Sequence, residues 1–295
     1  ETSKIVGGSG PVGRFIPDRF LVDSNEPDFA DSCTDFTYMG QYFEYDNNPK
    51  ITLEAVNVNN DTTKNYGGQD TNEDYWKLLG NPIPYYNDET KDVNANFTSE
   101  DELSDTWNNT RSNYNGTGTL SIKGDRFNFN KTKKQSPFYS LVNCTFSSAE
   151  LTDNDAVCYD PNDNGTCQKF AVDANSSVSG QQPVNGTELR YGKVSLSPAY
   201  GSELLELDMP FEVQYRTTSG FIQNKKDNCT QYYTTNMTCS DPDTSDNLEC
   251  SNVNPTTPYG NDVVQGEGTF TLTKPGANNT GTLNSTLTLD PWLGN

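Results

Sequence analysis

ITLEAVNV, residues 51–58, decides the fold class, because apolar side chains recur at every second position from Ile51. In an extended chain these residues fall on one face, while Thr52 and Glu54 fall on the other. FEVQY, residues 211–215, repeats the alternation in the second half of the chain. A period of two is typical of strands that bury one face, so we predict an all-β protein.

Two pairs of alternating segments predict β-hairpins. Residues 269–273 lead through the turn-rich residues 274–279 to residues 282–289, which predicts a hairpin with a long loop. Residues 119–122 and 127–129 are separated by Lys-Gly-Asp-Arg and predict a second hairpin.

Helical patterns are confined to residues 72–79 and residues 99–107, the latter with Ser99 as its N-cap. The long helical crossovers that join parallel strands are missing, so the short strands and polar turns favour antiparallel sheets. We predict antiparallel β-sandwich modules with long polar, disulfide-closed loops and only short helices.

The chain divides into three segments. Residues 1–13 form a glycine-rich linker, residues 14–180 an N-terminal β module and residues 181–295 a C-terminal β-sandwich module. The boundary is drawn inside a Ser-, Gly- and Gln-rich interval that contains almost no aromatic residues. The linker formally matches a dinucleotide-binding fingerprint, but Pro11 interrupts the match and no helical pattern follows, so we reject this function.

The charge balance excludes several functions. The 295 residues include 41 acidic and 20 basic residues, for a formal net charge of −21, and no histidine. Without imidazole, Ser-His-Asp and Cys-His catalysis, two-histidine zinc sites and histidine-based pH switches are ruled out. Phosphate contacts need clustered Lys and Arg, so we expect no nucleic-acid partner. Partners should be neutral, cationic or metallic.

The hydrophobic core should be thin. Leu, Ile, Val and Phe make up 55 of 295 residues, about 19%, which together with the high charge is close to the composition of disordered chains. However, 14 Phe, 16 Tyr and 3 Trp can each bury a large area. We therefore expect a folded protein that depends on disulfides, bound metal or neighbouring subunits for part of its stability.

Cysteine usage indicates disulfides rather than a zinc or thioredoxin-type site, because no Cys-x-x-Cys pair occurs. Cys158 with Cys167, and Cys239 with Cys250, have spacings that would each close a polar loop. The other candidates are Cys33, Cys144 and Cys229, and the odd seventh thiol is either free or paired with another chain. Disulfides persist in oxidising compartments, so we expect an exported, extracellular or cell-surface protein.

Membrane insertion is not predicted, because no stretch approaches the roughly 18 consecutive apolar residues of a spanning helix. Glu1 is not the start of a signal peptide, so we expect a processed or excised segment of an exported protein.

The sharpest candidate ligand site is a calcium loop. Asp160, Asn162 and Asn164 occupy its first, third and fifth positions, with Gly165 at the sixth. The twelfth position is Ala171 instead of a bidentate Glu, so the match is partial. The alternative is a disulfide-closed polar turn, which we favour because Asp and Asn suit turn geometry. No cofactor is required, and Ca²⁺ is the one candidate.

Thirteen Asn-x-Ser/Thr sequons occur, about twice the number that composition alone would give. A glycosylated extracellular surface and a chance product of an Asn- and Thr-rich chain are equally good interpretations. The candidate acceptors are Asn60, Asn96, Asn108, Asn115, Asn130, Asn143, Asn164, Asn175, Asn185, Asn228, Asn236, Asn278 and Asn284.

Several ordered segments together point to one family. The strongest are RYGKVSL at residues 190–196 and AYGSELL at residues 199–205, preceded by VGRFIPDRF at residues 12–20 and FTYMGQ at residues 36–41. With FEVQY and the later DNCT at residues 227–230, they resemble the C-terminal domain of MshQ-type proteins. The resemblance implies an exported protein linked to biogenesis of the mannose-sensitive haemagglutinin pilus, and it supplies no catalytic residues.

Three functions are carried forward. The leading hypothesis is a non-enzymatic structural or adhesive component of a bacterial pilus or filament, whose partners are other surface or pilus subunits, including copies of itself. The alternative is a calcium-dependent, lectin-like module that binds host or environmental glycans, because of the acidic loops and the implied mannose link. The third is a carboxylate-based glycosidase, although nothing distinguishes any pair among the 41 acidic residues.

Overall fold

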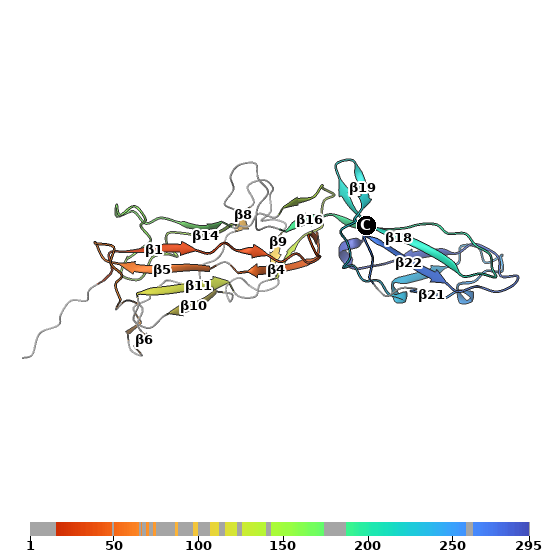
Figure 1. Ribbon diagram of the computed structural model, residues 1–295, viewed down its shortest axis with the longest axis horizontal. Coiled ribbons are helices and arrows are strands. Elements are labelled where there is room, and N and C mark those ends of the chain that lie inside the picture. The colour runs from red at the N-terminus through yellow and green to blue at the C-terminus, as the bar shows by residue number, and fades with distance from the viewer. Residues whose placement is uncertain are drawn as a thin grey trace, which may run out of the picture.

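The protein is an elongated molecule in which two β-rich modules lie end to end (Figure 1). We call residues 16–173 the N-terminal module and residues 187–294 the C-terminal module. The computed structural model describes residues 16–48, 50–64, 66, 69–70, 73–74, 86–87, 97–99, 107–111, 116–122, 126–139, 143–173, 187–257 and 262–294.

The N-terminal module is built from two four-stranded antiparallel sheets and smaller sheets beside them. The first sheet has the order β1 (Arg19–Ser24), β5 (Lys50–Val56), β11 (Thr117–Ile122) and β10 (Trp107–Arg111). The second has the order β2 (Asp28–Phe29), β4 (Tyr42–Asn47), β12 (Arg126–Phe129) and β9 (Phe97–Ser99). The others are β15 (Phe170–Asp173), β14 (Asn143–Phe146) and β8 (Tyr86–Asn87), and the pair β6 (Gln69–Asp70) and β7 (Glu73–Asp74).

The alternation in β5 places its residues as predicted, because Ile51, Leu53 and Ala55 are buried while the intervening residues are partly exposed. Aromatic rings supply much of the core that aliphatic residues cannot fill. Phe29 stacks on Tyr45 with ring centroids 4.3 Å apart and meets Phe127 edge-on. The aromatic content of the sequence thus explains how a chain so poor in aliphatic residues folds.

The C-terminal module has two antiparallel layers. One contains β17 (Gly192–Leu196), β18 (Leu207–Thr217), β22 (Glu267–Leu272) and β21 (Pro255–Thr256), with β19 (Gly220–Gln223) paired to β18. The other contains β20 (Met237–Ser240) and β23 (Asn284–Leu287). Its helices are single 3-10 turns, namely η2 (Thr234–Asn236), η3 (Cys250–Asn252) and η4 (Pro291–Leu293). The predicted all-β class with antiparallel sheets and only short helices is confirmed.

Both hairpin predictions were wrong. β22 pairs with β18 along one edge and with β21 along the other, while β23 pairs with β20 in the other layer. The long loop that looked like a hairpin turn therefore crosses between layers. β11 and β12 likewise belong to different sheets. Local alternation identifies a strand and its buried face, but packing between distant segments selects its neighbour.

The two predicted helices are also not supported where the structure describes them. Residues 73–74 form β7, Ser99 ends β9 and Trp107 begins β10. The remaining residues of both stretches lie outside the described part of the chain. Residues 1–13 and the boundary between residues 180 and 181 lie outside it as well, so those predictions stand untested.

The two modules interlock through a third small sheet. β16 (Glu188–Arg190) pairs antiparallel with β13 (Phe138–Tyr139) and parallel with β3 (Thr37–Tyr38). Phe36 and Tyr38 enter the core of the C-terminal module, whereas Leu189 and Tyr191 enter the core of the N-terminal module. Each module thus completes the core of the other.

Candidate functional site

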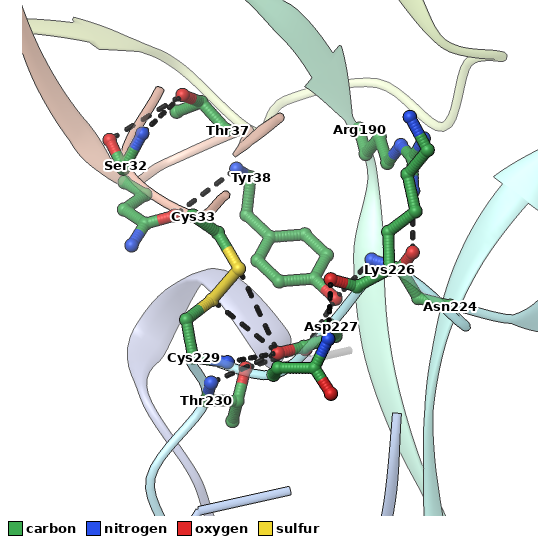
Figure 2. The surroundings of a disulfide bond; sticks show 12 residues. Ser32, Cys33, Thr37, Tyr38, Arg190, Asn224, Lys226, Asp227, Cys229 and Thr230 are labelled. Atoms are coloured by element: carbon green, nitrogen blue, oxygen red, sulfur yellow. Dashed lines mark hydrogen bonds between the residues drawn. A yellow bond between two sulfur atoms is a disulfide. The ribbon is translucent and has the colours of Figure 1, made fainter. Parts of the chain in front are cut away.

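The junction between the modules holds a hydrogen-bonded group of polar side chains beside a disulfide bond (Figure 2). Cys33 lies in the loop before β3, and Cys229 is separated from the end of β19 by a loop of five residues. The two residues form a disulfide, with their Cα atoms 5.7 Å apart. The two cysteines are 196 positions apart in sequence. The bond therefore ties the N-terminal module to the C-terminal module directly at their contact.

Asp227 lies beside this disulfide and is completely buried. Its Oδ1 accepts hydrogen bonds from the backbone N–H groups of Cys229, at 3.1 Å, and Thr230, at 2.9 Å. Its Oδ2 accepts from the Thr230 hydroxyl at 2.7 Å and from the Tyr38 hydroxyl at 2.8 Å. Four donors satisfy a carboxylate, which explains how a charged group is accommodated away from water.

Tyr38 connects this carboxylate to the rest of the junction. Its hydroxyl donates to Asp227 and accepts from Nδ2 of Asn224 at 2.6 Å (Figure 2). Burial, followed by the charge of Asp227, raises the pKa of Tyr38 well above its usual range. The phenol therefore stays protonated and keeps its donor role at any physiological pH.

Arg190 supplies a buried positive charge to the junction. Its guanidinium forms a two-point contact with Glu188, with Nε–Oε1 at 3.0 Å and Nη2–Oε2 at 3.2 Å, and Nη1 donates to Oδ1 of Asn224. It also lies over the rings of Phe36, at 4.6 Å, and Tyr215, at 4.5 Å. A planar cation held between two rings and a carboxylate fixes the relative position of both modules.

Gly192 follows Arg190 and permits this close approach. A Cβ atom at this position would lie 2.5 Å from Cδ1 of Tyr38 and 2.8 Å from Cδ2 of Leu293. We predict that Gly192→Ala lowers the free energy of unfolding by about 1–3 kcal/mol, because the Tyr38 ring must move away from its partners. Chemical denaturation measures this cost, and an unchanged midpoint would show that the junction adapts freely.

Lys131, in the N-terminal module, binds the last described residues of the C-terminal module. Its Nζ donates to the carbonyl oxygen of Trp292 at 2.8 Å and to that of Gly294, and it lies 4.6 Å from the ring centroid of Tyr191. Burial, aided by the charge of Lys134, lowers the pKa of Lys131 from 10.5 to about 8. The amine therefore loses its charge at a mildly alkaline pH.

This lowered pKa predicts a pH dependence of stability. Between about pH 8 and 10.5 the unfolded chain holds a proton on Lys131 that the folded chain has released. The free energy of unfolding therefore gains a positive contribution as pH rises through this window. We expect Lys131→Met to remove the contribution and the exposed Lys133→Met to retain it, in denaturation curves recorded from pH 7 to 9.5. Equal slopes for both variants would contradict the assignment.

The two short disulfides have formed as the spacing predicted. Cys158 is bonded to Cys167 and Cys239 to Cys250, with sequence separations of 9 and 11. For the odd seventh cysteine, Cys144, the structure gives only the backbone, in β14. Its side chain lies outside the described part, so its state remains a prediction.

In the predicted calcium loop, the side-chain oxygens accept hydrogen bonds from the backbone of the loop itself. Oδ2 of Asp160 accepts from the N–H groups of Asn164 at 2.9 Å and Gly165 at 2.7 Å, and Oδ1 accepts from that of Asn162 at 3.2 Å. Burial alone would raise the pKa of Asp160, but these donors lower it. Oδ1 of Asn164 accepts from the Thr166 N–H. The geometry is that of a capped polar turn, and calcium binding stays a prediction without support from it.

Seven of the thirteen sequons have described side chains. Asn60, Asn164, Asn228, Asn278 and Asn284 are exposed, whereas Asn130 and Asn236 are partly buried. The other six acceptors, Asn96, Asn108, Asn115, Asn143, Asn175 and Asn185, lie where the structure does not describe the side chain. Exposure is what a glycan acceptor requires, and occupancy stays a prediction.

A metal ion would need several ligand atoms close together, which we consider for the part of the chain that the structure describes. The one group with suitable spacing is Cys33, Asp227 and Cys229. Both sulfur atoms are already joined in the disulfide, so neither is available as a thiolate ligand. In the same part of the chain, no helix combines the length and apolar character that a bilayer crossing demands.

The fold and its junction define a class: an all-β protein of two modules, tied together by a disulfide and suited to an oxidising compartment. Family models give the particular assignment. Residues 1–174 match the third domain of DUF6701 and residues 190–295 match its fourth domain, so the chain belongs to the DUF6701 family. No curated protein and no solved structure matches the chain.

Proposed function

We propose that the protein is an extracellular structural or adhesive component of a bacterial surface assembly, such as a pilus or filament, and acts without covalent chemistry. The observation that carries the proposal is the junction. A disulfide, a buried carboxylate network and two exchanged core segments hold two β modules end to end. A part that transmits force or spans a distance is served by such a rigid joint.

Two further observations support a surface role. The ordered segments around Arg190 and Asp227 resemble MshQ-type proteins, which are linked to pilus biogenesis, and these same segments build the junction. The net charge of −21 keeps such a protein soluble and resists non-specific association. We therefore link the resemblance to the architecture of the joint rather than to a catalytic residue.

Localisation on native cells tests the proposal. Antibodies raised against the folded chain are used for immunogold electron microscopy of intact cells and of filaments sheared from them. We expect gold on the cell surface and along or at the ends of filaments. Labelling restricted to the cell interior, or native material that is only dispersed monomer with no association to any surface structure, would contradict the assignment.

A further inference from the structure

A groove of about 830 Å³ opens between the two layers of the C-terminal module at the end remote from the junction. β17 begins beside Tyr38 at the junction and runs away from it, so the loop of residues 197–206 that follows lies at this distal end (Figure 1). The last described residues return to the junction, where Gly294 contacts Lys131. The groove is therefore remote from that end of the chain.

The groove lies where side chains fill the space between the two layers less completely than they do near the junction. Near the junction, Phe211, Val213 and Phe270 are buried between the layers. Towards the distal end, aliphatic side chains of β17, β18 and β22 and of the neighbouring loops are only partly buried and line the groove. They are Leu196, Leu207, Leu272, Leu248, Val253 and Leu283. Leu205, at 66% exposure, stands on the rim.

The layer formed by β20 and β23 has fewer strands than the layer that it faces. Among the strands that the structure describes, β20 and β23 pair only with each other, opposite a layer of five. Residues 282–286, which include most of β23, line the groove. An edge strand offers main-chain donors and acceptors to an added strand, whose inward side chains would enter the groove.

The charge around the groove indicates what kind of strand fits. The lining segments, residues 196–209, 240–254 and 272–286, contain seven acidic residues and one basic residue, Lys274. Asp241, Asp246 and Glu249 line a second depression formed by the same loops. A second copy of the chain, with its own charge of −21, would be repelled, whereas a basic segment would be attracted.

We propose that this groove binds an extended peptide segment of a partner protein, in which aliphatic residues alternate with lysine or arginine. The segment adds a strand at the edge of β23, places its aliphatic side chains on Leu196, Leu207 and Leu272, and directs its basic side chains to the acidic loops. This inference extends the proposed surface role by giving the chemistry of its partner. Its failure would leave the cellular localisation unaffected.

The test uses the folded chain and immobilised synthetic peptides of about eight residues, the length of an ordinary strand. One peptide alternates valine with lysine, a second has the same composition in scrambled order, and a third replaces lysine by glutamate. We expect binding to the first alone. Two further peptides carry methyl groups on the backbone nitrogens of either the odd-numbered or the even-numbered residues. One of them should lose binding and the other should keep it, because only one of these two sets of N–H groups faces β23.

Two neighbouring leucines provide matched variants. Leu205 lines the groove, whereas Leu204 is similarly exposed, at 56%, and does not line it. We expect Leu205→Asn to weaken binding about tenfold and Leu204→Asn to leave it unchanged, since each replaces an exposed leucine without changing charge.

Three results would overturn the proposal. They are binding of the scrambled peptide as tight as that of the alternating peptide, an affinity of the Leu205→Asn variant equal to that of the unmodified protein, and no binding of any peptide. Sedimentation showing a dimer of the free chain that Leu205→Asn dissociates would assign the groove to a second copy and would overturn it as well.

Discussion

Replacing Cys33 and Cys229 together by alanine should lower the free energy of unfolding by about 5 kcal/mol, the largest loss expected from any disulfide in this protein. The bond closes a loop of 196 positions, and in the chain-entropy account the stabilisation grows with the logarithm of loop length. Denaturant unfolding followed by intrinsic tyrosine and tryptophan fluorescence measures the loss.

The short disulfide Cys158–Cys167 provides the matched control. It closes a loop of only 9 positions, for which the same account gives about 3 kcal/mol. Replacing both of its cysteines by alanine should therefore cost clearly less and should leave the junction between the modules intact. If the two pairs of substitutions cost the same, constraint of the unfolded chain across the two modules is not what the long bond contributes.

The contrast between these disulfides also shows what a sequence can predict. The pairs Cys158–Cys167 and Cys239–Cys250 were predicted from their spacing. Residues so near to each other in sequence can meet in space regardless of how the rest of the chain folds. Cys33 and Cys229 were only candidates, because their meeting depends on how two whole modules dock. The same limit explains the strands: alternation in β5 and β18 correctly predicted the buried faces, while the partners of β22 and β11 were predicted wrongly.

The junction network escaped prediction for a physical reason. Asp227 follows two lysines and precedes Asn228, so its local sequence is that of an exposed polar turn among 41 acidic residues. Its burial arises from Tyr38, which lies 189 positions away. One signal was available, since the DNCT and RYGK segments carried the family resemblance, but nothing in them indicates that their charged residues face inward.

Removing the Asp227 carboxylate should have an effect comparable to removing the disulfide beside it. We expect Asp227→Ala to lower the free energy of unfolding by about 4 kcal/mol or more, because three buried donors and one partly buried donor lose their acceptor and each unsatisfied buried group costs about 1–3 kcal/mol. Asp227→Asn should cost less, since one amide oxygen remains to accept. The exposed Asp243→Ala is the control and should stay within about 1 kcal/mol of the unmodified protein.

A double-mutant cycle separates the contribution of the Tyr38–Asp227 hydrogen bond from general damage. Tyr38→Phe removes the hydroxyl that donates to Asp227 and accepts from Asn224, while the ring remains packed against Phe36. If the two side chains act as one unit, adding Tyr38→Phe to Asp227→Ala should cost less than Tyr38→Phe alone, with a coupling energy of about 1–3 kcal/mol. The reason is that the hydroxyl has already lost its acceptor. Strictly additive losses would mean that the carboxylate stabilises only its own loop, through Thr230 and Cys229, and contributes nothing to holding the modules together.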